Sequence, residues 1–349
     1  SIFEFANLCK SIAQTCKNIQ HDDQPPRRHP IEGCVARSPA VLLQDLTMEA
    51  IGDELKISRS SVSRLLDTAR SRGIVDIRVT SPTEAPQRIE AAIKDQFGVK
   101  ALIVPVPERT SHIDRLDRVA VTAARLLSDF FSSNMTMGIA WGSTTSAVSR
   151  HLIKKSVPNS EVVQLNGAGN DHSTGVTYSS EILRRFGEAF GAQVTHFPVP
   201  AFFDDPATKA ALWRERSTAR IVELQKKIDI ALFGLGSIKA EVPSQVYIGG
   251  YLSDEDLSIL SNDGVVGDVA TVFYRADGSW TDIALNLRSS GPGLDVIGRV
   301  PRKLCVVSGI SRLESLKGAL AANLITDLII DETTARALIS PTQSTSVSA

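Results

Sequence analysis

Long apolar runs are missing from this chain of 349 residues, and so are other patterns that mark specialised classes of protein. No stretch of about 18 uninterrupted apolar residues occurs, so we expect no membrane-spanning helix. The N-terminus lacks a basic region followed by a long apolar one, so we expect no secretory signal peptide. The composition, 42% hydrophobic and 22% charged, is ordinary for a soluble globular protein, and the length suits two or three domains.

Cysteine is scarce and scattered. The four cysteines are Cys9, Cys16, Cys34 and Cys305. No histidine pair accompanies Cys9 and Cys16 at zinc-site spacing, so we expect neither a metal ion nor a cofactor. Reduced thiols in the cytoplasm are the simplest account of so few cysteines.

A large net charge of either sign is also missing, since the formal net charge is -1. Any contact with nucleic acid must therefore come from a local patch of charge. Six basic residues lie between Lys56 and Arg78, against two acidic ones, Asp67 and Asp76. This excess of positive charge is what phosphate contacts need, although a solvated helix face gives the same pattern.

Residues 47–66 show the pattern of a helix-turn-helix, with apolar residues at helical spacing on one face. Ser58 stands where a helix N-cap belongs, and its hydroxyl is placed to accept a hydrogen bond from the amide near Ser61. The exposed start of the second helix, 58–70, carries short polar groups and guanidiniums that suit base edges and phosphates in a major groove. An ordinary helical hairpin is the alternative. The residues predicted to contact DNA are Lys56, Ser58, Arg59, Ser60, Ser61, Ser63, Arg64 and Arg72.

Proline-rich and polar stretches divide the chain into segments. We assign no role to the leader and spacer, residues 1–33. A helix-turn-helix domain is expected over 34–80, a linker over 81–88, an α/β domain over 89–340 and a tail over 341–349.

The α/β domain is predicted from an alternation of apolar runs and amphipathic stretches, which is typical of a mostly parallel sheet covered by helices on both faces. A hairpin is expected between 271–274 and 280–287 across the turn 276–279. The predicted strands are 101–106, 137–141, 162–165, 230–235, 304–307 and 328–330. The predicted helices are 88–97, 113–131, 144–152, 180–190, 253–260 and 312–322.

The order of several motifs behind the helix-turn-helix resembles the SorC family of sugar-responsive transcription regulators, which includes the DeoR-type deoxyribonucleoside regulators. The motifs lie at 138–145, 163–167, 233–236, 264–268 and 326–332, and the resemblance spans about residues 38–340. It implies an effector domain similar to sugar-phosphate isomerases, with Rossmann-type layers. It also implies homodimers or homotetramers that bind double-stranded operator DNA with an affinity controlled by a phosphorylated sugar or a related metabolite.

Loops at the carboxyl ends of the strands are the expected ligand site, because open α/β sheets bind ligands there. The loop of Gly142, Ser143, Thr144 and Thr145 opens a helix, and its amides and hydroxyls suit phosphate, although a plain turn capped by Ser143 or Thr144 is the alternative. The other predicted effector residues are Gln164, Asn166, Gly167, Gly236, Asp268 and Arg312. Gln164 and Asn166 could instead satisfy loop backbone, and Gly236 or Asp268 could simply form turns.

Arg312 marks a departure from the family pattern. Many relatives carry a lysine at this place in a Gly-Gly-x-x-Lys loop, whereas this chain has Ser308, Gly309 and Arg312. Arginine can hold phosphate in a bidentate way but cannot form a Schiff base, so covalent capture of an aldehyde here is excluded. The departure leaves open a nonphosphorylated sugar, polyol or sugar acid. Lys239 is a second cation near the loops, and we interpret it as a surface lysine.

A sugar-phosphate isomerase or deaminase is the alternative function. Such an enzyme needs an acid/base pair near the sugar carbons, and only His172 among the six histidines lies near a predicted ligand loop. A DNA-binding head also has no use in an enzyme of this kind. We therefore predict a cytoplasmic, ligand-controlled regulator that has no catalytic residues and no contact with a membrane.

Overall fold

The computed structural model describes residues 58, 60–61, 85–107, 109–240 and 244–340. The chain divides between Ser81 and Pro82 into two units, and nearly all of the described residues belong to the second. Of the predicted helix-turn-helix, only Ser58, Ser60 and Ser61 are among the described residues. The amide of Ser61 donates to the Ser58 hydroxyl at 3.2 Å, which is the predicted capping contact.

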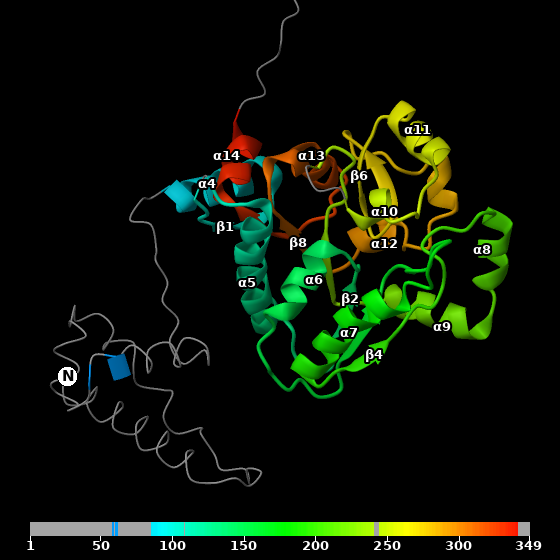
Figure 1. Ribbon diagram of the computed structural model, residues 1–349, viewed down its shortest axis with the longest axis horizontal. Coiled ribbons are helices and arrows are strands. Elements are labelled where there is room, and N and C mark those ends of the chain that lie inside the picture. Colours follow the sequence, from blue (N-terminus) through cyan, green and yellow to red (C-terminus); the bar gives the residue numbers. More distant parts are fainter. Residues whose placement is uncertain (1–57, 59, 62–84, 108, 241–243, 341–349) are drawn as a thin grey trace, which may run out of the picture. The chain divides into compact units, whose positions relative to one another are not determined.

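Seven parallel strands form the central sheet in the order β1-β9-β8-β5-β2-β3-β4. Figure 1 labels four of them, β1, β8, β2 and β4, which follow one another across the sheet in that order. The six strands expected from apolar runs are all present, to within two residues at either end. The strands are β1 (Lys100–Val104), β2 (Thr136–Ile139), β3 (Glu161–Gln164), β4 (Gln193–Thr195), β5 (Ile230–Gly234), β8 (Arg302–Val307) and β9 (Asp327–Asp331).

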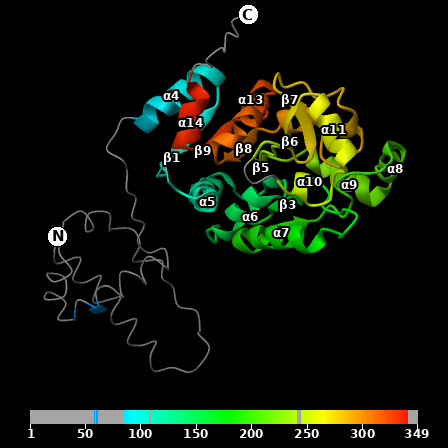
Figure 2. The same cartoon turned by 45° about the horizontal axis from the view of Figure 1, so that its top comes forward.

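Helices cover both faces of this sheet, as the buried apolar strands require. Figure 2 shows α13 and α14 on one side and α5, α6 and α7 on the other. Neighbouring strand residues point into different layers: Val162 packs with the helices of the α5 side, and Val163 packs with those of the α13 side. The helices that form the two layers are α4 (Ala85–Phe97), α5 (His112–Phe130), α6 (Ser143–Arg150), α7 (Val176–Phe190), α9 (Arg216–Gln225), α13 (Leu313–Ala321) and α14 (Glu332–Ile339).

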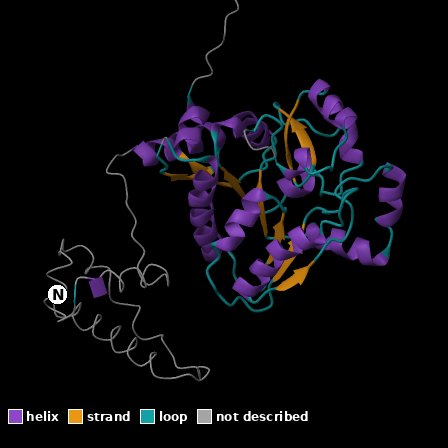
Figure 3. Ribbon diagram, in the orientation of Figure 1, coloured by secondary structure: helices purple, strands orange, loops and turns teal. Residues whose placement is uncertain are grey.

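Shorter elements complete the described unit, and Figure 3 separates them from the loops by colour. The helix α4 begins at Ala85, inside the stretch 81–88 that we expected to be a linker. No helix among the described residues combines the length and the apolar character needed to cross a membrane. The remaining elements are α8 (Pro206–Leu212), α10 (Gln245–Ile248), α11 (Asp254–Asn262), α12 (Leu294–Gly298), and the 3-10 turns η2 (Ala284–Leu287) and η3 (Ile310–Arg312).

The predicted hairpin between 271–274 and 280–287 is wrong. Strand β7 (Val272–Arg275) pairs antiparallel with β6 (Val265–Val269), which precedes it in the chain. The segment 284–287 is the 3-10 turn η2, and it approaches β7 through one side chain: the Asn286 amide accepts from the amide of Phe273 and donates to the carbonyl of Phe273. A side chain therefore makes the pair of hydrogen bonds that we expected from a strand backbone.

The order in which the chain adds strands to the sheet reverses between β2 and β5, and this reversal determines where a ligand can bind. From β2 the chain continues outward through β3 and β4, and from β5 it continues the opposite way through β8 and β9. The loops that leave β2 and β5 therefore separate, and they open a crevice at the carboxyl ends of the two neighbouring strands. Open α/β sheets bind their ligands at such a switch point.

Candidate functional site

A crevice lies at this switch point, partly open to solvent. It brings together eight of the ten predicted effector residues, from the loops after β2, β3, β5 and β8 and from β6. The lining residues are Ala140, Trp141, Gly142, Ser143, Thr144, Thr145, Asn166, Gly234, Leu235, Gly236, Ser244, Gln245, Val246, Asp268, Ala270, Thr271 and Arg312. Gln164 and Gly167 are not among them.

The first turn of α6 forms one wall of the crevice. Gly142 is the N-cap residue, and no side chain caps this end, so neither Ser143 nor Thr144 plays the capping role of the alternative interpretation. The Thr145 hydroxyl instead donates to the carbonyl of Gly142 at 3.1 Å. Amides at an uncapped helix start, together with the positive end of the helix dipole, favour an anion.

Gly234 allows Thr144 to lie close to the end of β5. A side chain at position 234 would place its Cβ 2.6 Å from the Thr144 hydroxyl oxygen. Both Thr144 and Thr145 are buried against the sheet. The wall formed by α6 is therefore fixed in place by packing rather than by a capping hydrogen bond.

Asp268 places a carboxylate in the same lining. It lies in β6, is 5% exposed, and accepts a hydrogen bond from the Tyr247 hydroxyl at 2.8 Å and one from the amide of Thr271 at 3.2 Å. Burial raises the pKa of this carboxyl to about 6, although both hydrogen bonds oppose the rise. Burial and the neighbouring Asp268 also raise the pKa of Tyr247 well above its usual value, so the phenol keeps its proton.

Only a residue without a side chain fits at position 236, because the Asp268 carboxylate lies against it. The Gly236 amide donates to the backbone carbonyl of Asp268 at 3.0 Å, and a Cβ at position 236 would lie 1.7 Å from the Asp268 side chain. Asp268 is therefore part of a strand packed against the loop after β5, and its carboxylate also accepts from Thr271 in the turn between β6 and β7.

The two polar residues at the end of β3 differ in what their side chains contact. The Gln164 amide donates to the carbonyl of Asn166 at 2.7 Å and accepts from the amide of Phe197, so both of its ends satisfy backbone. The Oδ1 atom of Asn166 is buried and has no hydrogen-bond partner among the described residues. Ser244, at the start of α10, also lines the crevice with a buried hydroxyl oxygen that lacks a partner there. Buried polar atoms are costly unless something satisfies them, so these two are candidates for ligand contacts.

Arg312 brings a guanidinium to the crevice although it is only 5% exposed. Burial lowers its pKa, but the pKa of an arginine lies so far above neutral pH that the group stays charged. Its Nη1 atom lies 3.1 Å from the carbonyl oxygen of Ser308 and 2.9 Å from Nε2 of His112. By contrast, Lys239 is an exposed residue paired with Glu314, as expected of a surface lysine.

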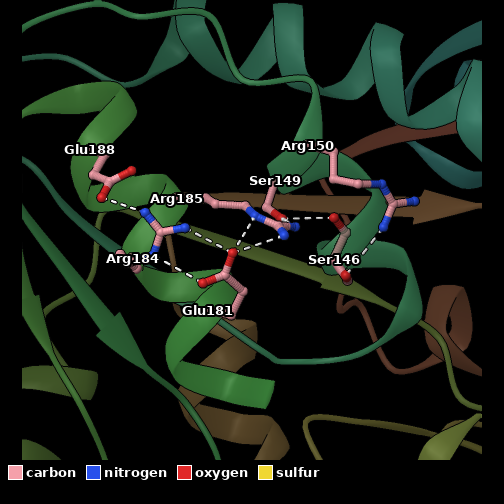
Figure 4. A network of polar contacts seen from close by, with 7 residues as sticks. All are labelled: Ser146, Ser149, Arg150, Glu181, Arg184, Arg185 and Glu188. Carbon is pink, nitrogen blue, oxygen red and sulfur yellow. Dashed lines mark hydrogen bonds and ion pairs between the residues drawn. The ribbon is translucent and has the colours of Figure 1, made fainter. Parts of the chain in front are cut away.

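The far end of α6 is tied to its neighbours by polar contacts. Arg185 of α7 donates to the Ser149 hydroxyl at 3.3 Å and also pairs with Glu181 (Figure 4). Nε2 of His151, at the end of α6, lies 2.7 Å from the carboxylate of Asp117 in α5. The helix whose start lines the crevice is thus held at its other end by both neighbouring helices.

A family model described as a sugar-binding domain (Sugar-bind) matches residues 81–340. The deoxyribonucleoside regulator of Bacillus subtilis is 33% identical over 298 residues, which cover 84% of this chain and 93% of that protein. The chain belongs to this SorC/DeoR-type family of transcriptional regulators. Another member, the LsrR regulator of an Enterobacter species, is 26% identical over 84% of this chain and 88% of that protein.

Solved structures of the family agree with the fold. A domain of a possible sugar-binding transcriptional regulator from Arthrobacter aurescens is 52% identical, with a TM-score of 0.70 over 75% of this chain and 100% of that chain. The full-length sorbitol operon regulator from Klebsiella pneumoniae shares the fold at 21% identity, with a TM-score of 0.67 over 85% of this chain and 94% of that chain. The names of these four relatives describe regulators, and none of the four names describes an isomerase.

Sequence patterns missed His112, Tyr247 and Ser244. His112 does not lie in any of the ligand motifs, yet it contacts Arg312, which is 200 positions away in the chain. The histidine that the sequence placed closest to the ligand loops, His172, is exposed and belongs to a different surface cleft. No local signal could have reversed this ranking, because the contact depends on how β8 and α5 pack together.

Proposed function

We propose that the crevice binds an anionic carbohydrate, of which a sugar phosphate is the simplest example, and that this ligand controls the affinity of the regulator for operator DNA. The observation that carries the proposal is one lining that holds an uncapped helix start, a buried guanidinium and a buried carboxylate. The first two groups favour an anion, and the third accepts from hydroxyl groups.

The phosphate and the hydroxyl groups of the ligand contact different sides of the lining. The amides at the start of α6 and the Thr144 hydroxyl receive the phosphate, together with Arg312, while the Thr145 hydroxyl stays bonded to the carbonyl of Gly142. Asp268 accepts from sugar hydroxyls, and Asn166 and Ser244 supply buried oxygens that lack a partner among the described residues. Gln164 and Gly167 act one step away, since they hold the backbone of the loop that carries Asn166.

Control of transcription further requires a DNA-binding head. We assign it to residues 34–80, with Arg59, Ser60, Ser63 and Arg64 at base edges and phosphates, and Lys56 and Arg72 on the backbone of the duplex. A homodimer or homotetramer would present two such helices to two half-sites of a double-stranded operator in the cytoplasm.

The test is fluorescence anisotropy on DNA from upstream of the gene's own operon, titrated with sugars, polyols and sugar phosphates. We expect one phosphorylated compound to change operator affinity. Substituting Arg312→Met should then weaken the response to that compound by roughly 10- to 100-fold, which is the loss of a charged hydrogen-bond partner. The matched control is Lys239→Met, which removes a cation from an exposed ion pair outside the crevice lining and should leave the response unchanged.

Three results would contradict the proposal. If the phosphorylated compound changed operator affinity equally in the two variants, the anion would not bind at Arg312. A response only to uncharged sugars would remove the anionic group from the ligand. Turnover of a sugar phosphate would return the chain to the isomerase class.

A further inference from the structure

The contact between Arg312 and His112 has a definite chemical direction. A guanidinium carries only N–H donors, so Nε2 of His112 must be the acceptor across the 2.9 Å separation. The imidazole is then neutral, and its proton lies on Nδ1. The geometry therefore selects one protonation state and one tautomer of His112.

The same contact fixes the plane of the guanidinium. The Nη1 atom of Arg312 carries two N–H groups, and they meet Nε2 of His112 and the carbonyl oxygen of Ser308. Both acceptors are attached to regular structure, since His112 begins α5 and Ser308 follows β8. Two fixed acceptors on one nitrogen leave the planar group little freedom to rotate.

The loop beneath Arg312 is anchored as well. The amide of Gly309 donates to the Asp331 carboxylate at 2.8 Å, and Arg115 of α5 pairs with the other oxygen of Asp331 at 3.0 Å. Gly309 has φ +94°, and the atoms nearest to its missing Cβ belong to His112. The loop after β8 and the start of α5 thus pack against each other around these polar contacts.

We propose that His112 is a positioning residue of the effector site, whose neutral imidazole aims the Arg312 guanidinium at an anion in the crevice. The inference rests on the proposed function, because it presumes that Arg312 binds the anionic part of the ligand. Lysine, which the family resemblance places at position 312, is a point charge on a flexible stem and needs no such partner. Arginine binds an anion through the N–H groups of its planar guanidinium, and that plane must be turned toward the anion. In this chain His112 and Arg312 together therefore bind the anion that a single lysine would bind.

The test is a double-mutant cycle on the full chain, with inorganic phosphate as the probe and calorimetry at about pH 8, where phosphate is a dianion. The variants are H112L, R312K and the double substitution. We expect H112L to weaken phosphate binding about fivefold to tenfold while Arg312 is present, and by less than about twofold when position 312 is lysine. A His112 that matters only for folding would weaken binding by the same factor in both backgrounds.

A conservative variant and a spectrum complete the test. H112Q keeps an amide oxygen that can accept from the guanidinium, so it should recover most of the affinity that H112L loses. Imidazole ¹⁵N shifts at the same pH should show a His112 protonated on Nδ1 alone. A proton on Nε2, or equal weakening by H112Q and H112L, would overturn the inference.

The failure of the proposed function would look different. If R312M binds phosphate as tightly as the natural chain, the anion site itself is misplaced. If R312M weakens binding while H112L has no effect or an equal effect in both backgrounds, the site stands and only the role of His112 is refuted.

Discussion

At the scale of single residues, Asp268 shows how the fold changes the chemistry of a common side chain. Its carboxyl is buried in β6, and the Tyr247 hydroxyl and the amide of Thr271 hydrogen-bond to it. Burial disfavours the charged form more than these two donors favour it, so the pKa rises to about 6. The carboxyl therefore changes charge within a pH range where an ordinary aspartate remains ionised.

We predict a pH dependence of stability that Asp268→Asn removes. Because the folded-state pKa lies above the unfolded value of 3.8, the folded protein binds a proton that the unfolded chain releases. The stabilisation is complete below about pH 4 and is lost as the pH rises through about 6, a loss of roughly 3 kcal/mol in the free energy of unfolding. Urea unfolding of both proteins at several pH values measures this difference. Parallel curves would show that the Asp268 carboxyl titrates normally.

Residues also show where sequence reasoning reached its limit. Gln164 ends β3 and Asn166 lies in the loop that follows, both with an amide side chain, and the pattern gives them the same role. The structure separates them, because the Gln164 amide meets the backbone of Asn166 and Phe197, whereas Asn166 lines the crevice. Arg312 could be predicted from its place in a motif, but its partner His112 could not, since only tertiary packing joins them.

At the scale of elements, the loop after β3 is held by close contact between two backbone segments. Gly167 accepts a hydrogen bond from the Trp141 ring and donates one to Ser290. A Cβ at position 167 would lie 2.2 Å from the carbonyl oxygen of Val199 and 2.4 Å from that of Pro200. Backbone atoms cannot move aside as a flexible side chain can.

We predict that Gly167→Ala destabilises the protein by about 1–3 kcal/mol, because the added methyl group overpacks this contact. The matched control is Gly298→Ala at the end of α12, where an added Cβ has no atom within 4 Å. Urea unfolding of the two variants measures the difference. Equal stability of the two would mean that the loop after β3 relaxes without cost.

The elements also explain which parts of the fold were predictable. Six strands with long apolar runs were found because burial on both faces leaves a strong local pattern. Strand β4 was not predicted because it has three residues, Gln193–Thr195, and none is fully buried. The wrong hairpin has a different cause: 280–287 does contact β7, but through the Asn286 side chain, which leaves no strand periodicity.

At the scale of the whole molecule, a regulator of this family requires two sites whose affinities depend on each other. The crevice is the candidate for one, and the predicted recognition helix at 58–70 is the candidate for the other. Coupling between binding sites is reciprocal, so the factor by which the effector changes operator affinity equals the factor by which the operator changes effector affinity. Two anisotropy titrations, each at saturating concentration of the other ligand, test this equality.

The last prediction separates the two sites. Substituting Arg59→Ala with Arg64→Ala should weaken operator binding and flatten its salt dependence by about two in log–log slope, since two phosphate-neutralising cations are lost. Affinity for the effector without DNA should stay unchanged. The control, Arg216→Ala with Arg220→Ala, removes the same charge from exposed positions on α9. If the control weakens operator binding equally, net charge rather than the predicted helix governs the contact. If neither pair of substitutions has an effect, residues 58–70 do not form the recognition helix. Loss of operator binding by the Arg59 and Arg64 pair alone, with effector affinity kept, would place the two functions in separate units of one chain.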